Sequence, residues 1–137
     1  YIVDGQTTDA PIIGVLNGIF YNAATTLKPT FANFYTQVTP ANSEDIDAFV
    51  FDSPTQQYVV ATDDAVTQAG FLETYDMNTS AGSDITGKSS ATLDIGDTSA
   101  DAATFRLLRV AEDPENEDIT AARCSVVVVP NLIELQS

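Results

Sequence analysis

A glycine-rich string in the middle of the chain has the spacing of a phosphate-binding loop. Gly82, Gly87, Lys88 and Ser89 complete the pattern G-x-x-x-x-G-K-S. In nucleotide triphosphatases this loop follows a buried strand and opens a helix, and its backbone N–H groups hold the phosphates. Here the preceding residues, ETYDMNTSA, are polar, and the following residues, SSATLDIGD, alternate with the period of a strand. The context therefore predicts a polar loop that leads into a strand, not a nucleotide site.

The composition removes most other nucleophilic and metal chemistry. The 137 residues include no histidine and no tryptophan, and the single cysteine, Cys124, precedes the apolar run SVVVV. Without histidine, the Ser-His and Cys-His forms of nucleophile activation and His-ligated metal sites are excluded. We expect Cys124 to be a buried structural thiol. The sequence predicts no catalytic residue, no cofactor and no enzymatic activity.

Two acidic stretches are the remaining candidates for a cation site. Asp94, Asp97 and Asp101 lie close together, and the run EDPENED at 112–118 carries five carboxylates. Neither stretch has the spacing of an EF-hand loop. A carboxylate pair could also hydrolyse a sugar, but nothing indicates which pair would lie at the required separation. We interpret both stretches as solvated acidic turns and predict no metal site.

The charge of the chain limits its partners. There are 20 acidic and 5 basic residues, for a formal net charge of −15. Nucleic acids are bound through clustered Lys and Arg side chains, and anionic membranes attract the same residues. We therefore predict no nucleic-acid and no membrane partner, which leaves proteins, neutral sugars and cations. No apolar run reaches the roughly 18 residues of a membrane span.

Short β-rich runs separated by turn residues indicate the fold class. They predict an all-β fold, a single small antiparallel β-barrel or sandwich over 14–137, with an extended arm or edge strand over 1–13. The turn DSPT at 52–55, between two β-rich runs, predicts a hairpin. Further strands are expected within 89–97, within 104–118 before its acidic turn, and within 122–135, where Pro130 ends the strand.

Aromatic residues gather early in the chain, and their number allows two interpretations. Phe20, Tyr21, Phe31, Phe34 and Tyr35 lie within sixteen residues. They could form the core of a barrel. Alternatively, some of them could anchor a protein interface, where aromatic side chains are enriched.

Several stretches together resemble a group of small virion proteins of tailed bacteriophages, especially phages of marine and cyanobacterial hosts. These are capsid decoration, or cement, proteins. The resemblance runs in order over most of residues 14–131 and rests on GIFYN (18–22), KPTFANFY (28–35), DIDAFVFDSP (45–54), YVVATDD (58–64), TGKSSATLDI (86–95), FRLLRVAEDPEN (105–116) and CSVVVVPN (124–131). The sequence departs from the group at Ser53, where a second Asp is expected, and after Val60, where Ala-Thr-Asp-Asp replaces a Gln-Ala-Asp-Gly-like turn.

The resemblance implies a structural role on the outer surface of a phage head. The expected partner is the major capsid protein, and self-association as a homo-oligomer is also compatible with it. A protein with a net charge of −15 is better suited to the outside of a head than to contact with packaged DNA. The expected interface residues are Tyr1, Ile2, Val3, Ile12, Ile13, Phe20, Tyr21, Phe31, Phe34 and Tyr35. The alternative function is a calcium- or carbohydrate-binding β-module of the adhesin type, which the acidic turns motivate.

Overall fold

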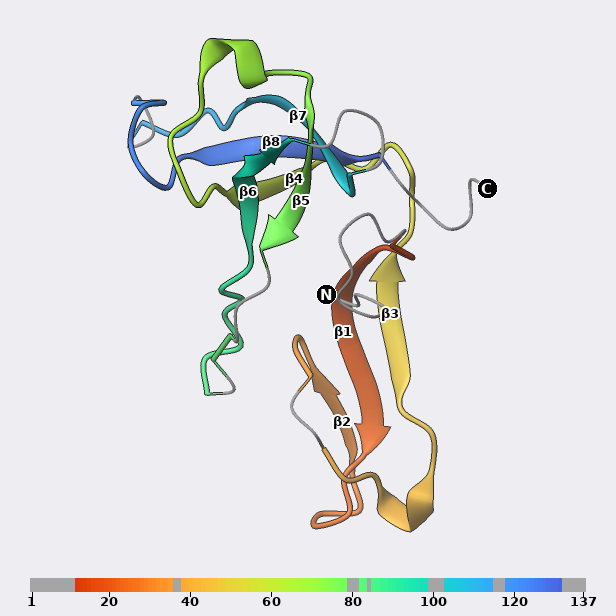
Figure 1. Ribbon diagram of the computed structural model, residues 1–137. Helices are drawn as coiled ribbons and strands as arrows, with labels where there is room; N and C mark the ends of the chain where they lie inside the picture. Colours follow the sequence, from red (N-terminus) through yellow and green to blue (C-terminus); the bar gives the residue numbers. More distant parts are fainter. Residues whose placement is uncertain are drawn as a thin grey trace.

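The computed structural model of the chain contains eight described strands in two sheets (Figure 1). The structure describes residues 12–35, 38–78, 82–83, 85–98, 103–114 and 118–131. The strands are β1 (Val15–Asn22), β2 (Pro29–Ala32), β3 (Asp47–Phe51), β4 (Tyr58–Ala61), β5 (Thr74–Asn78), β6 (Thr92–Thr98), β7 (Phe105–Val110) and β8 (Ser125–Pro130). Two short 3₁₀ turns, η1 (Ala41–Ser43) and η2 (Gln68–Gly70), are the helical elements of the described residues.

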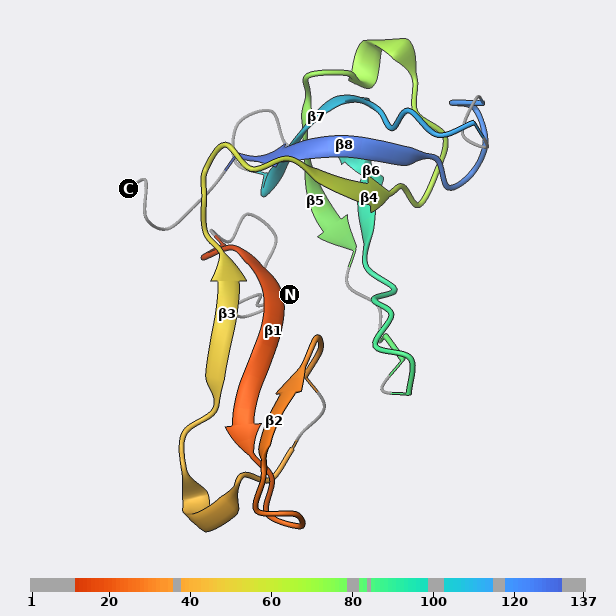
Figure 2. The same ribbon diagram turned by 180° about the vertical axis from the view of Figure 1, so that it is seen from behind.

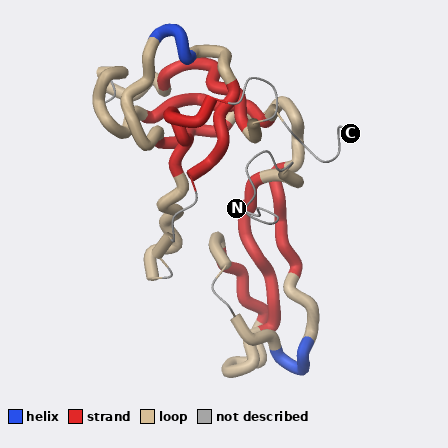
Figure 3. Tube along the Cα trace, viewed as in Figure 1, coloured by secondary structure: helices blue, strands red, loops and turns tan. Residues whose placement is uncertain are grey.

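The all-β prediction is confirmed. One sheet has three strands in the order β2-β1-β3, the other has five in the order β4-β8-β7-β5-β6, and neighbouring strands in both are antiparallel. Strands account for most of the regular structure in Figure 3. The described strands close no barrel, so of the two predicted forms a sandwich fits. In Figures 1 and 2 the three-stranded sheet reaches well beyond the five-stranded one.

Strand β8 occupies a central position in the five-stranded sheet because its sequence suits burial on both faces. It pairs with β4 on one side and β7 on the other, and Val126, Val127 and Val128 are all buried. A continuous β-branched run is typical of a strand that is covered on both faces. The strand ends at Pro130 as predicted, because proline has no N–H group for a ladder.

The five-stranded sheet curls around the main hydrophobic core. Its edges approach each other at Thr62, just after β4, which forms an isolated bridge with Leu93 in β6. The core consists of Ile12, Val66, Tyr75, Leu93, Phe105, Leu107, Cys124, Val126 and Val128. Cys124 is therefore the buried thiol that was predicted. The early aromatic residues are absent from this cluster, so their interpretation as the core is wrong.

The predicted hairpin around residues 52–55 is also wrong. Both of its strands form, and a turn lies between them, with the Gln56 N–H donating to the Ser53 carbonyl at 3.2 Å. However, β3 pairs with β1 and β4 pairs with β8, so the two runs belong to different sheets. The segment 52–57 is a connection from one sheet to the other, and the hydroxyl of Tyr58 spans it by donating to the Phe51 carbonyl at 3.2 Å.

Candidate functional site

The main candidate site is one face of the three-stranded sheet, on which phenylalanine side chains from all three strands meet. Phe20 of β1 lies opposite Phe31 of β2, and Gly18 of β1 lies opposite Phe49 of β3. Directly opposed residues in an antiparallel pair share a face, and so do residues two apart in one strand. Phe20, Phe31, Phe49 and Phe51 therefore project from the same side of the sheet. We call these four residues the phenylalanine face.

The phenylalanine face is open to solvent. The exposed fractions are 37% for Phe20, 60% for Phe31, 48% for Phe49 and 48% for Phe51. The rings of Phe31 and Phe49 contact each other, with centroids 6.1 Å apart and planes inclined by 44°. Large contiguous apolar patches are uncommon on monomeric proteins and mark interaction sites. This face therefore has the character of a docking surface.

The opposite face of the same sheet has a different character. Ile19 is 2% exposed and lies opposite Ala32 in β2 and Ala48 in β3. A sheet with one covered and one solvated face normally carries polar residues on its solvated side. Here the large aromatic rings stand on the solvated side, and the small alanines flank the buried Ile19. The face around Ile19 is covered only in part, because Ala48 is exposed.

The structure separates the predicted interface residues. Phe20 and Phe31 belong to the phenylalanine face. Tyr21 and Phe34 are partly buried. Tyr35 is exposed and, with Phe34, lines the cavity beside the glycine-rich loop. Ile13 is exposed. Ile12 belongs to the hydrophobic core, so its assignment to the interface needs correction. Tyr1, Ile2 and Val3 lie outside the described residues.

Phe49 and Phe51 also belong to the site, although the sequence did not predict them as interface residues. The alternation in AFVF places both rings on one side of a strand, and that signal is visible in the sequence. What the sequence does not show is that this side faces solvent. Only the pairing with β1 brings these rings beside Phe20 and Phe31.

The glycine-rich string is not built as a phosphate-binding loop. Its N–H groups are used inside the loop: Ser83 N–H donates to the Lys88 carbonyl at 2.9 Å, Gly87 N–H to the Ser83 carbonyl at 2.8 Å, and Thr86 N–H to Ser83 Oγ at 3.2 Å. The residues that follow form strand β6 and not a helix. A phosphate would find these three N–H groups already bonded, and strand β6 in place of the helix N-terminus that such loops supply.

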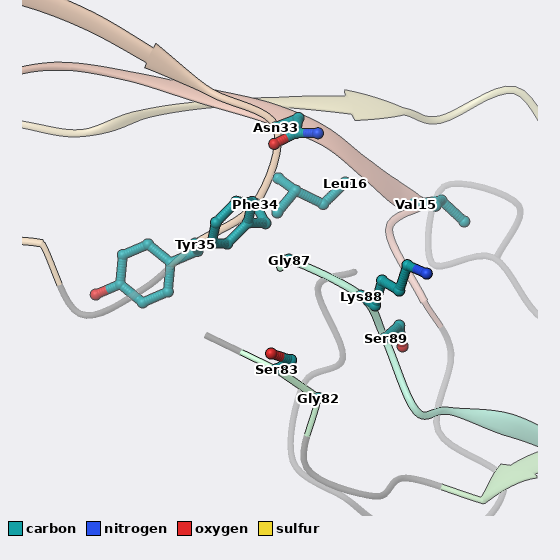
Figure 4. Close-up of a pocket in the computed structure, with 10 residues that line it drawn as sticks. All are labelled: Val15, Leu16, Asn33, Phe34, Tyr35, Gly82, Ser83, Gly87, Lys88 and Ser89. Carbon is teal, nitrogen blue, oxygen red and sulfur yellow. The ribbon is translucent and has the colours of Figure 1, made fainter. Parts of the chain in front are cut away.

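The same loop does line a surface cavity. The cavity has a volume of about 420 Å³ and is bounded on one side by residues around Leu16 and Phe34. On the other side it is bounded by Gly82, Ser83, Gly87, Lys88 and Ser89. The ring of Phe34 lies close to Gly87, and the Lys88 side chain extends away from Ser83 (Figure 4). Gly87 has a φ of +69°, which glycine adopts without strain. The loop that leads into β6 therefore contacts Phe34, which follows β2 of the three-stranded sheet.

In the described parts of the acidic stretches, carboxylates accept hydrogen bonds from backbone N–H groups two residues further along the chain. Asp118 Oδ1 accepts from the Thr120 hydroxyl at 2.6 Å and from the Thr120 N–H at 2.9 Å, and these bonds lower the pKa of the Asp118 carboxyl. Asp94 Oδ1 accepts from the Gly96 N–H at 3.0 Å. Within the described ranges no three acidic or cysteine side chains gather as a metal site. The structure does not describe the side chain of Asp97, and Asp101 lies outside the described residues.

Comparisons with known proteins found no relative of this chain. No protein-family description, no curated protein and no solved structure matches this chain. The described part of the chain contains no helix long and apolar enough to cross a bilayer.

Proposed function

We propose that this chain is a structural virion protein that binds the outer surface of an assembled phage head and stabilises the shell as a decoration protein. The observation that carries the proposal is the phenylalanine face, which places four half-exposed aromatic rings on a sheet that reaches beyond the main core. The sequence resemblance to decoration proteins supports the same role. The partner is the major capsid protein.

The mechanism is preferential binding to one state of the shell. A protein that binds the assembled, expanded lattice and not its dissociated subunits stabilises that lattice by mass action. A shell presents many equivalent sites, so a small stabilisation at each site adds up over the particle. Stable attachment needs roughly 1,200–2,000 Å² of buried surface at each site.

The phenylalanine face does not supply enough free energy alone. Full burial of a Phe side chain contributes about 1.5–3 kcal/mol, so four half-exposed rings contribute about 3–6 kcal/mol. Association costs an estimated 4–15 kcal/mol in lost freedom of motion. A second contact is therefore required, and the N-terminal arm with Tyr1, Ile2 and Val3 is our candidate, by strand addition to a neighbouring sheet edge.

The test is sedimentation of the purified protein with mature, undecorated heads of the source phage in physiological salt. We expect saturable pelleting at a fixed ratio to the major capsid protein. The double variant Phe31→Ser/Phe49→Ser should lose most of this binding. The matched control is Ile85→Ser, which removes one isolated side chain that is 93% exposed and should pellet like the wild type.

A second variant tests the arm. Because Ile12 belongs to the core, the truncation must stop before it, and we choose the removal of residues 1–10. Weaker pelleting of this truncated chain, with an unchanged melting temperature, would support the arm as the second contact. Failure of the wild type to pellet with intact, expanded heads would overturn the decoration role.

A further inference from the structure

Carboxylates lie at one end of the phenylalanine face. Asp47 lies directly opposite Phe20, on the same side of the sheet. At that end Glu44 Oε2 accepts a 2.7 Å hydrogen bond from Asn22 Nδ2, two residues beyond Phe20 in β1. Asp52 follows Phe51 in the chain and is exposed. The rings at the Phe20 end of the face therefore lie beside negative charges.

The segment that builds this sheet is poor in compensating positive charge. Residues 15–52 contain four acids, Glu44, Asp45, Asp47 and Asp52, and one base, Lys28, which gives 1 − 4 = −3. All four carboxylates and Lys28 are exposed. The rim of the phenylalanine face is thus negative, while its centre is apolar.

We propose that the partner surface of the phenylalanine face is an apolar patch with a rim of Lys and Arg side chains. This inference rests on the proposed function, because it describes the site on the shell that the face would occupy. Apolar contact at the centre excludes water, and opposite charges at the rim orient the two surfaces and accelerate their encounter. An acidic or anionic partner would be repelled by the carboxylates beside the rings.

A second copy of this chain does not fit the same face. An isologous pair would place two identical negative rims against each other. Each of the two chains would also bring a formal net charge of −15. Like charges brought together across an interface oppose binding. The negative rim therefore keeps the free protein from pairing through its phenylalanine face, while it favours a basic partner.

The first experiment compares charge variants in the head-binding assay over a range of salt concentrations. Asp45→Asn/Asp47→Asn removes two charges from the segment that enters β3 beside Phe20. Glu73→Gln/Glu112→Gln removes two exposed charges that lie just before β5 and just after β7. We expect the rim variant to bind heads roughly 2- to 30-fold more weakly at low salt, with the difference fading at high salt. The control should bind like the wild type. Equal effects of both variants, or tighter binding of the rim variant, would overturn the inference.

The second experiment does not depend on heads. Two labelled peptides share one Leu- and Val-rich centre and differ in their flanks, which are lysines in one and glutamates in the other. We expect measurable binding of the lysine peptide alone, reduced by Phe31→Ser/Phe49→Ser and by Asp45→Asn/Asp47→Asn but not by Glu73→Gln/Glu112→Gln. Equal binding of both peptides, or binding insensitive to the face, would overturn the inference even if heads are decorated.

Sedimentation equilibrium of the free protein tests whether two copies of the chain associate through the phenylalanine face. We expect a monomer at low and high salt for the wild type. Dimerisation that appears when salt screens the rim and disappears in Phe31→Ser/Phe49→Ser would assign the face to self-association and overturn the inference. Absence of head binding together with selective binding of the lysine peptide would overturn the decoration role and keep the basic partner.

Discussion

Phe31 and Phe49 contact each other across Gly18, although they lie on strands that are not neighbours. Strand β1 separates β2 from β3, and a side chain at Gly18 would stand between the two rings. A Cβ at that position would lie 2.5 Å from Phe31 Cζ and 2.9 Å from the Ala32 carbonyl oxygen. The missing side chain lets the rings join into one surface.

The replacement Gly18→Ala should therefore disturb the phenylalanine face and destabilise the three-stranded sheet. The added methyl group meets a backbone oxygen as well as a ring, so rotation of Phe31 cannot relieve the contact completely. Overpacking of this kind costs about 1–3 kcal/mol. Urea denaturation should show a lower free energy of unfolding.

Gly96→Ala is the matched control for this change. A Cβ at Gly96 would meet only the Asp94 carboxylate, at 3.4 Å, and the position is exposed in β6. Replacement of glycine by alanine at a compatible site stabilises a chain by about 0.4–1 kcal/mol. Equal effects of Gly18→Ala and Gly96→Ala would contradict the close packing at Gly18.

The phenylalanine face should contribute little to folding. Cross-strand pairs contribute roughly 0.2–1 kcal/mol each, so Phe31→Ser/Phe49→Ser should lower the free energy of unfolding by no more than about 1–2 kcal/mol. Phe105→Ala in the core should cost about 3–5 kcal/mol, because Phe105 is 4% exposed. A dye that binds exposed apolar surface should bind the wild type more strongly than the double serine variant.

Local patterns in the sequence predicted individual strands well. The alternation in SSATLDIGD and the β-branched run SVVVV became β6 and β8, and Cys124 is buried beside the latter. Each of these signals depends on a few adjacent residues and on the side chains that a buried strand requires. The polar loop that was predicted in place of a nucleotide site also followed from its immediate context.

Pairing between distant residues could not be predicted from such patterns. The turn at Pro54 forms, yet Phe51 pairs with Val15 and Val59 pairs with Val127. The competition among possible partners is decided by tertiary packing, which the turn does not influence. For the same reason periodicity placed Phe49 and Phe51 on one side of a strand without showing that this side is open to water.

The buried carboxylate of Asp76 provides a third prediction. Its Oδ1 accepts from the Thr104 N–H at 3.2 Å and from the Thr104 hydroxyl at 3.3 Å, and its Oδ2 has no partner within the described part of the chain. Asp76→Ala should lower the free energy of unfolding by about 1–3 kcal/mol, because the buried N–H loses its acceptor. Asp76→Asn keeps the acceptor and should cost less. If Asp76→Ala and Asp76→Asn lowered the free energy of unfolding equally in urea denaturation, the hydrogen bonds to Thr104 would not be the source of the stability that Asp76 contributes.

The glycine-rich loop should respond to substitution but not to nucleotides. Gly87→Ala should destabilise the protein, because φ is +69° and an added Cβ would clash with the ring of Phe34. Magnesium with ATP or GTP should leave the melting temperature of the wild type unchanged. A nucleotide at a hundred times its dissociation constant would add about 2.7 kcal/mol, so calorimetry would detect it. An upward shift that Lys88→Ala abolishes would contradict the structural role of the loop.

Tyr75 should make stability depend on pH in the alkaline range. Its hydroxyl donates to the Gly70 carbonyl at 2.9 Å, and burial, followed by the charge of Glu73, raises its pKa above the ordinary 10.0. Because the folded state favours the neutral phenol, this contribution is complete below about pH 10 and is lost as pH rises through the raised pKa. Tyr75→Phe should cost about 0.5–1.5 kcal/mol at pH 8, and the difference from the wild type should shrink above pH 10. A difference between wild type and Tyr75→Phe that stays constant to pH 11 would contradict the assignment.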